Sequence, residues 1–392
     1  MAEIPDIEDL SNPLLTDELT NDLKRQAYKV VGSHSAVKLC DWTKKYLLDG
    51  SYCYKQQFYN IGTGKCMQMS TNAACSNRCV FCWRHQRTPI YQDEWKWDMD
   101  NAEDLLTQCL KAQHHLIKER QGIAGVDMGR LTDSLDIKHC ALSLVGEPLL
   151  YPEVNTFINQ LHGMGISTFL VTNGQHPQAI ADLTPVTQLY LSVDASNSQA
   201  LKAIDRPVYK DYWERLLASL DILSARPERT VIRLTCVRHM NIEPRFLEEY
   251  GELINRGRPD FIELKGLSYV GHARDALEWE NVTSISQLCE MTKRLLPFIP
   301  EYELISVHPR SRAVCLARKT MYRDGKWQAF IDFDEFFSVV SDGTIEKGTY
   351  DCPIAEEYVH DMEHFEELKK TDVPTLKGKA DIYGESQDDL IQ

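Results

Sequence analysis

The chain has 392 residues, of which 43% are hydrophobic, and this is enough for one large domain or two ordinary ones with a sizeable core. The formal net charge of −15 argues against indiscriminate binding of nucleic acid, and no stretch of 18 apolar residues exists to span a membrane. The N-terminus is acidic and lacks the apolar core of a signal peptide, so we expect a cytoplasmic protein.

Composition along the chain predicts four parts. Residues 1–22 carry seven acids and no base and form an acidic arm, and residues 23–65 form an N-terminal extension that carries several cysteines. Residues 66–350 form an α/β domain, and residues 351–392 form an acidic C-terminal tail. Across the first two parts, residues 17–48 mix apolar and polar side chains at roughly helical spacing, which indicates helix.

From Cys66 onward, short apolar segments alternate with helix-like segments. The predicted strands cover residues 66–71, 140–146, 167–173, 189–195, 230–237 and 261–266, and the predicted helices cover residues 102–121, 153–163, 198–203, 209–223, 244–256 and 284–297. This alternation predicts βαβ units and a parallel sheet with right-handed crossovers. Polar residues recur at successive strand ends, which favours a partial α/β barrel over a doubly wound sheet. Residues 302–308 and 326–332 are two further strand-like segments.

Twelve cysteines in a cytoplasmic chain indicate metal binding or catalysis, since disulfides are disfavoured there, and six of the twelve lie between positions 40 and 82. Cys75, Cys79 and Cys82 form a C-x3-C-x2-C triad in the loop after the first predicted strand. Three thiolates this close can hold three irons of a 4Fe-4S cube and leave the fourth iron without a protein ligand.

The open iron of such a cube can chelate the amino and carboxylate groups of S-adenosylmethionine (SAM), as a catalytic metal keeps an open position. One electron from the cube then cleaves the sulfonium and releases a 5′-deoxyadenosyl radical. The triad therefore predicts an enzyme of the radical SAM class. The alternative is a zinc site with His85 as a fourth ligand, although zinc usually takes four ligands from paired C-x2-C knuckles.

Candidate SAM contacts share a position at strand ends or in the triad loop. They are Phe81, Gly146, Glu147, Asn173, Ser192 and Asp194. The carboxylate of Glu147, which follows the second predicted strand, can accept hydrogen bonds from the methionine ammonium. The polar residues after the third and fourth strands are candidates for ribose or carboxylate contacts. The alternative for each of them is an ordinary turn.

Three more cysteines lie upstream of the triad at two equal intervals of thirteen residues: Cys40, Cys53 and Cys66. They can hold a second 4Fe-4S cube with one open iron, and the alternative is that some are core residues. Lys55 lies two residues after Cys53, and an amine near an electropositive cluster has a lowered pKa. Lys55 can therefore attack a ketone as a Schiff-base nucleophile, with Lys65 and Lys265 as rivals and a surface lysine as the alternative.

Taken together, the motifs resemble those of the tRNA 4-demethylwyosine synthase family. The similarity lies in the upstream cysteines, in the run GTGKCMQMSTNAACSNRCVFCWRHQ at 62–86, and in SLVGEP, VTNG, LSVDA, FIELKG and HPRSRAVCLARK. It covers the stretch from about residue 24 to residue 340. The resemblance implies an α/β fold, a partial (βα)6 radical-SAM barrel with an N-terminal cysteine-bearing extension, and two 4Fe-4S clusters.

The resemblance also implies a reaction. Family members condense N1-methylguanosine of tRNA(Phe), next to the anticodon, with pyruvate, and form the tricyclic 4-demethylwyosine of wybutosine biosynthesis. The deoxyadenosyl radical takes a hydrogen from the N-methyl group, the carbon radical adds to pyruvate, the carboxylate carbon is lost and a third ring closes. By matching motifs, the triad would hold the SAM cluster, and the upstream cysteines would hold an auxiliary cluster that anchors pyruvate. Lys55 would form the Schiff base with pyruvate.

Members of the family in eukaryotes carry an N-terminal flavodoxin-like domain as an electron source. This chain starts too late for such a domain, so it resembles the shorter archaeal type. We therefore expect a monomer that takes electrons from an external flavodoxin- or ferredoxin-like donor.

Basic residues gather in two zones, with eleven Lys or Arg against two acids in residues 23–92 and six against one in residues 305–326. Such zones indicate a polyanion site or simply solvated faces. An anticodon base must be splayed out to reach a radical, and proteins grip such loops through phosphates and stacking. Trp83 can stack on a base or shield the cluster. The candidate RNA contacts are Lys44, Lys45, Arg78, Arg84, Arg87, Arg310, Arg312 and Arg318.

The sequence is also compatible with two other functions. One is a different radical SAM enzyme with an auxiliary cluster that modifies RNA or a peptide, which analysis of the product would distinguish. The other, from a different class, is a zinc-stabilised RNA-binding module without catalysis, which the iron and sulfide content after anaerobic purification would distinguish.

Overall fold

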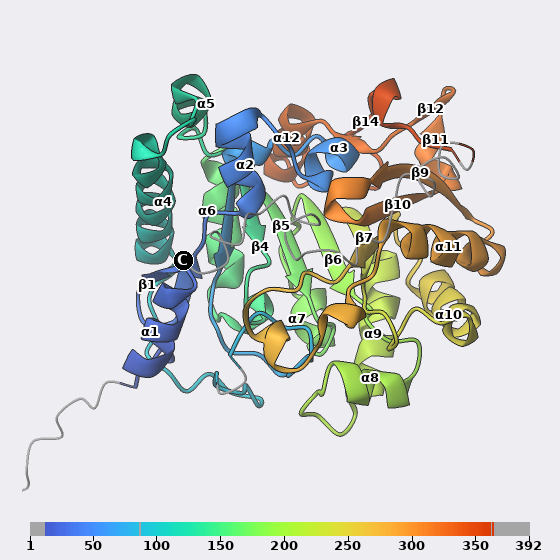
Figure 1. Ribbon diagram of the computed structural model, residues 1–392, viewed down its shortest axis with the longest axis horizontal. Helices are drawn as coiled ribbons and strands as arrows, with labels where there is room; N and C mark the ends of the chain where they lie inside the picture. The colour runs from blue at the N-terminus through green and yellow to red at the C-terminus, as the bar shows by residue number, and fades with distance from the viewer. Residues whose placement is uncertain (1–11, 86–87, 362, 364–392) are drawn as a thin grey trace, which may run out of the picture.

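The computed structural model describes residues 12–85, 88–361 and 363, and its centre is one ten-stranded sheet in the order β1-β2-β3-β4-β5-β6-β7-β8-β10-β9 (Figure 1). The six parallel strands are β3 (Cys66–Ser70), β4 (His139–Leu142), β5 (Ser167–Thr172), β6 (Gln188–Ser192), β7 (Arg229–Cys236) and β8 (Phe261–Gly266). All six strands predicted from Cys66 to Gly266 are thus confirmed. Antiparallel pairs extend the sheet at each edge: β1 (Lys29–Val31), β2 (Ser35–Val37), β9 (Tyr302–His308) and β10 (Ala313–Arg318).

The parallel strands follow one another in chain order, so each crossover steps in the same direction. Right-handed crossovers that never reverse place all helices on one face of the sheet, as in a barrel, whereas a doubly wound sheet reverses its order. The helices between strands are α4 (Ala102–Lys118), α5 (Met128–Asp133), α6 (Val154–Gly163), α7 (Pro177–Ala181), α8 (Ser198–Ile204), α9 (Tyr212–Ala225), α10 (Leu247–Gly257) and α11 (Ile285–Leu295). The expected partial α/β barrel is confirmed.

Side chains alternate between two cores along each strand. Leu189 and Leu191 of β6 pack in the core under the helices, whereas Tyr190 packs with Phe169 and Phe261 inside the curve of the sheet. We call this inner face of the sheet, together with the side chains packed against it, the chamber. In Figure 1, α4 and α6 lie on the left of the view, α9, α10 and α11 on the right, and α7 and α8 below. The helices thus follow the outer face of the curved sheet.

The N-terminal segment differs from the expected run of helix. Residues 17–48 form α1 (Asp17–Arg25), the β1–β2 hairpin and α2 (Asp41–Asp49), and β2 pairs with β3. Gly32 makes the hairpin possible, because its φ is +57° and the Asp100 carboxylate fills the space where a Cβ would point. The division expected between residues 22 and 23 falls inside α1, whose Leu19 and Leu23 are buried.

Several short elements were not expected from the sequence. These are α3 (Tyr54–Tyr59), α12 (Phe333–Ser341), β11 (Tyr322–Arg323), β12 (Lys326–Trp327), β13 (Phe330–Ile331) and β14 (Asp351–Cys352). The strand expected at 326–332 is therefore split in two. β14 pairs with β13, and buried Asp351 forms an ion pair with Arg229, so the expected tail begins inside the fold. Residues 364–392 of that tail lie outside the described part of the chain. Among the described helices, none is long and apolar enough to cross a membrane.

Candidate functional site

The cysteine triad lies in the loop that follows β3, at the carboxyl ends of the parallel strands. The loop is fixed to the end of α8, because the backbone N–H groups of Arg78 and Val80 donate to the carbonyls of Asp205 and Ile204, both at 2.9 Å. The three sulfurs are only partly covered. Buried Arg84 braces the loop from inside by donating to the Asn77 carbonyl at 2.6 Å.

The environment of Cys75 suits a thiolate that binds iron. Burial raises the pKa of its thiol to about 11, and a bound metal would displace that proton. Two N–H groups donate to its sulfur at 3.4 Å, from the backbone of Asn77 and the side chain of Asn173. The charge of Cys82 also raises the pKa of Cys75, and the charges of Cys82 and Cys75 raise the pKa of Cys79. The three thiols of the triad therefore interact electrostatically. The donor set therefore fits a 4Fe-4S cube that takes three thiolates.

Glu147 lies beside the triad, as expected of a SAM contact. It precedes the short helix η3 (Pro148–Leu150), and its carboxylate accepts N–H groups of Leu149 at 3.3 Å and Asn173 at 2.8 Å. Burial raises the pKa of its carboxyl to about 7. Gly146 must stay a glycine, because its φ is +78° and a Cβ would meet the Asn72 carbonyl oxygen at 2.1 Å.

The other expected SAM contacts lie nearby in different surroundings. Ser192 ends β6 and is partly accessible, whereas Asp194 is buried and accepts the Thr235 N–H at 2.6 Å. Burial raises the pKa of Asp194 to about 6. Phe81 packs against the core beneath the helices. No motif pointed to Asp205, a buried carboxyl that interacts with Cys79 and has one oxygen without a hydrogen-bond partner.

The upstream cysteines also come together. Cys40 and Cys53 are the N-cap residues of α2 and α3, their sulfurs make no capping hydrogen bond, and Cys66 begins β3. Burial raises the pKa of Cys40 to about 11 and that of Cys66 to about 12, and in both cases Cys53 raises it further. The three thiols thus interact with one another electrostatically, so they fit a second cube.

The two cysteine sets lie at opposite ends of β3. Cys66 begins the strand and Cys75 follows its end, and the strand itself spans roughly 13 Å. Among the described residues, no three His, Cys, Asp or Glu side chains converge as the ligands of a single metal ion would. A cube spreads its thiolates over different irons instead.

Lys55 extends from α3 into the chamber. Its amine lies 4.6 Å from the centre of the Tyr190 ring and 6.0 Å from that of Phe169. Burial lowers the pKa of Lys55, Arg233 lowers it further, and Glu263 raises it. Cys66 and Cys53 also raise this pKa, so the amine is within electrostatic range of the upstream cysteines.

The two rival lysines lie in contrasting places. Lys65 is at the surface, where it pairs with Asp133 at 2.9 Å and Asp136 at 3.2 Å, and these partners raise its pKa. Lys265 is buried on β8 and donates to the Gly266 carbonyl at 2.8 Å. Burial, then the charges of Arg312 and Arg233, lower the pKa of Lys265 well below its ordinary value.

The candidate RNA contacts divide into exposed and buried residues. Arg84 and Arg312 are buried and donate to backbone carbonyls, so the expectation that they contact RNA is corrected: their charges serve internal loops. Arg78 is exposed beside the triad, and Arg318 is half-buried at the end of β10. Arg87 lies outside the described residues. Arg310 donates to Ser51 at 3.1 Å, so the two basic zones meet at the surface.

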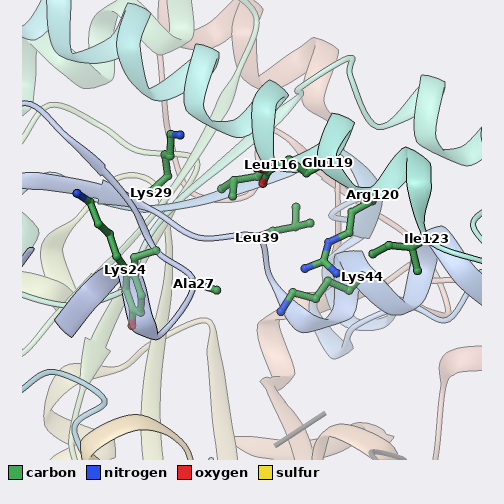
Figure 2. A pocket seen from close by; sticks show the side chains of 10 residues that line it. Lys24, Ala27, Lys29, Leu39, Lys44, Leu116, Glu119, Arg120 and Ile123 are labelled. Atoms are coloured by element: carbon green, nitrogen blue, oxygen red, sulfur yellow. The ribbon is translucent and has the colours of Figure 1, made fainter. Parts of the chain in front are cut away.

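Lys44 and Lys45 lie on α2. Lys45 stands over the Trp42 ring at 5.2 Å, and Lys44 pairs with Asp41 at 2.8 Å. Lys44 also borders a surface hollow of about 390 Å³ between α1, α2 and the end of α4 (Figure 2). Three further basic residues line this basic hollow, namely Lys24, Lys29 and Arg120.

Comparison with known proteins agrees with this geometry. A family model described as "Radical SAM superfamily" matches residues 69–249, and one described as "Wyosine base formation" matches residues 256–318. The S-adenosyl-L-methionine-dependent tRNA 4-demethylwyosine synthase TYW1 of Mus musculus is 44% identical over 328 residues, which is 83% of this chain and 45% of that protein. The synthase of Oryza sativa subsp. japonica is 44% identical over 333 residues, 84% of this chain and 50% of that protein.

Two solved structures are similar along nearly their whole length. TYW1 with a lysine-pyruvate adduct bound superposes with a TM-score of 0.70 at 32% identity, covering 78% of this chain and 97% of that one. Archaeal TYW1 gives a TM-score of 0.63 at 30% identity with the same coverage. The chain spans about half the length of the curated relatives it matches.

The barrel, the triad loop and the superfamily match together define a radical SAM protein, a class that holds a 4Fe-4S cluster and SAM. Within that class, the chain belongs to the tRNA 4-demethylwyosine synthase family, TYW1. The resemblance seen in the sequence is confirmed.

Proposed function

We propose that this chain condenses N1-methylguanosine of tRNA(Phe) with pyruvate to form 4-demethylwyosine. The observation that carries the proposal is the chamber, which has the triad at one end and the Lys55 amine near the upstream cysteines at the other. A radical site and a nucleophile for a ketone would therefore lie toward the two ends of one inner face of the sheet. A solved relative that holds a lysine-pyruvate adduct supports the same pairing.

At the radical end, Cys75, Cys79 and Cys82 would hold the cluster, which when bound supplies the electron that cleaves SAM to a 5′-deoxyadenosyl radical. Glu147 would accept the methionine ammonium, because a cation there offsets the burial of its carboxylate. Asn173 orients Glu147 through its backbone N–H. The remaining SAM contacts that we propose are Phe81, Gly146, Ser192 and Asp194.

At the other end, Cys40, Cys53 and Cys66 would hold an auxiliary 4Fe-4S cluster that anchors pyruvate. The neutral amine of Lys55 would add to the ketone carbon, and loss of water would leave an imine. Lys65 is less suited, because two aspartates keep its ammonium form at the surface. Lys265 stays a rival, since it is buried on the same inner face.

We further propose that the enzyme acts as a cytoplasmic monomer with an external one-electron donor. We also propose that the basic residues with accessible side chains bind the tRNA backbone, namely Lys44, Lys45, Arg78, Arg310 and Arg318. Lys44→Glu and Arg310→Glu are expected to weaken tRNA binding and to lower the slope of log affinity against log salt by about one per lost phosphate contact. Filter binding at several salt concentrations measures both. Arg245→Glu, exposed near α10, is the matched control and leaves binding unchanged. An unaltered slope in Lys44→Glu would remove that residue from the tRNA site.

The proposed reaction is tested by an anaerobic assay with tRNA that bears N1-methylguanosine, pyruvate, SAM and a chemical reductant. Nucleoside mass spectrometry should find 4-demethylwyosine only when all components are present. A different SAM-dependent product would instead indicate another RNA- or peptide-modifying radical SAM enzyme. Zinc without iron or sulfide in the anaerobically purified protein would indicate the non-catalytic RNA-binding module.

A further inference from the structure

Two side chains of opposite charge in the chamber wall carry buried polar atoms that make no hydrogen bond. Arg233 of β7 and Glu263 of β8 are register partners on neighbouring strands, so they lie side by side on the inner face. Glu263 is 0% exposed, and neither of its oxygens makes a hydrogen bond of good geometry, although the Tyr54 and Tyr59 hydroxyls lie close enough to interact with it. The Nε of Arg233 is also buried without a hydrogen-bond partner.

Leaving such groups unpaired is unfavourable. A buried charge without hydrogen bonds destabilises a fold strongly, and buried polar atoms in native proteins nearly always have partners. Arg233 and Glu263 are not hydrogen-bonded to each other, even though the strand register makes them neighbours. A polar ligand that enters between them would satisfy both.

Their position in the chamber indicates what that ligand is. Lys55 stands over Tyr190, whose register partner on β7 is Val231, and Arg233 lies two residues further along that strand. Two residues of a strand rise roughly 6.6 Å, so Arg233 is the next residue after Val231 on the same face of β7. The register partner of Arg233 on its other side is Ser192, a proposed SAM contact. Arg233 therefore lies between the Lys55 amine and the radical end of the chamber.

We propose that Arg233 and Glu263 form the recognition site for a 2-oxo acid joined to Lys55, with Arg233 binding its carboxylate and Glu263 facing its iminium N–H. The inference rests on the proposed Schiff base at Lys55. A guanidinium binds a carboxylate through two parallel N–H groups, and a carboxylate is the natural counterion of an iminium. Such an adduct carries one negative and one positive group, and the two wall residues match them in charge.

The first test measures adduct formation, not turnover. Borohydride reduces the imine to a stable amine, and peptide mass spectrometry then quantifies the adduct on Lys55 as pyruvate is varied. Arg233→Gln is expected to raise the pyruvate concentration for half-maximal trapping by roughly 10- to 100-fold, since a charge-assisted hydrogen bond is lost. Arg233→Lys, which keeps the charge, should restore part of the loss.

The second test asks whether Arg233 recognises the carboxylate of the ketone substrate. The wild-type protein should trap pyruvate in strong preference to hydroxyacetone, a ketone of similar size without a carboxylate. Arg233→Gln should lose the preference for pyruvate. Glu263→Gln should trap less of both ketones but should keep that preference. Iron content should stay at the wild-type value in each variant, which shows that the fold is intact.

The outcomes separate this inference from the proposed function. Trapping on a lysine other than Lys55 in the wild-type protein would overturn the recognition site and move the Schiff base to that lysine, whereas absence of 4-demethylwyosine from the complete anaerobic assay would overturn the proposed function. Normal trapping at Lys55 with an unchanged pyruvate requirement in Arg233→Gln and Arg233→Lys would overturn the recognition site alone. Loss of half the iron from Arg233→Gln would also overturn it, because Arg233 would then be a counterion of the upstream cysteines.

Discussion

Cys75→Ala is expected to lose about half of the bound iron and all formation of 5′-deoxyadenosine. Two cubes of four irons give about eight irons per chain, and removing one of only three ligands of a cube should release that cube. Cys75 is also the sulfur that receives two N–H donors and lies beside Glu147, so its loss removes the centre of the SAM site. Iron and sulfide analysis after anaerobic reconstitution measures the first effect, and chromatography of SAM products measures the second.

The complementary variant removes all three upstream cysteines, Cys40, Cys53 and Cys66. It should also lose about half of the iron, yet still form deoxyadenosine, because β3 separates these residues from the triad. Cys352→Ala is a control, since Cys352 is half-buried in β14 and belongs to neither set. A full iron load in the triple variant would contradict the auxiliary cluster.

The parallel core of the fold could be predicted because its signals are local. Each strand from β3 to β8 is a short apolar run, and a helix with its own amphipathic pattern follows most of them. The β1–β2 hairpin was missed for a physical reason. Its strands are three residues long and owe their shape to Gly32, the Asp100 carboxylate and the edge of β3, none of which a helical periodicity reveals.

The candidate site was predictable where residues close in sequence make the chemistry. The triad spans eight residues, so spacing alone identifies it. Arg84 and Arg312 were misplaced because a basic side chain looks the same in sequence whether it meets solvent or a buried carbonyl. Arg233 and Glu263 escaped notice for the converse reason, since only the register of β7 and β8 shows that the two charges share the chamber.

The structure also narrows the choice of lysine, which spacing alone left open. Lys55 and Lys265 both lie on the chamber side, whereas Lys65 is held outside by Asp133 and Asp136. Lys265 already donates to the Gly266 carbonyl. The Lys55 amine instead stands over the Tyr190 and Phe169 rings.

Lys55→Arg is expected to abolish formation of 4-demethylwyosine while iron content and SAM cleavage stay intact. The guanidinium keeps the positive charge beside the upstream cysteines, but it does not deprotonate in proteins and cannot form the imine. Burial lowers the pKa of Lys55, so the amine reaches its nucleophilic form more readily than a surface lysine does. Nucleoside mass spectrometry measures product, and borohydride trapping with pyruvate should label Lys55 in the wild-type protein and nothing in the variant.

The rival lysines provide the matched controls for this result. Lys65→Arg keeps the ion pairs with its two aspartates and should retain full turnover and trapping. Lys265→Arg tests the harder alternative, because Lys265 is the other buried amine of the chamber wall and its pKa is lowered even further by burial and by Arg312. An adduct that survives in Lys55→Arg and disappears in Lys265→Arg would move the Schiff base from α3 to β8. Lys55 is favoured because its amine is within electrostatic range of both Cys53 and Cys66, where the proposed auxiliary cluster would hold the ketone.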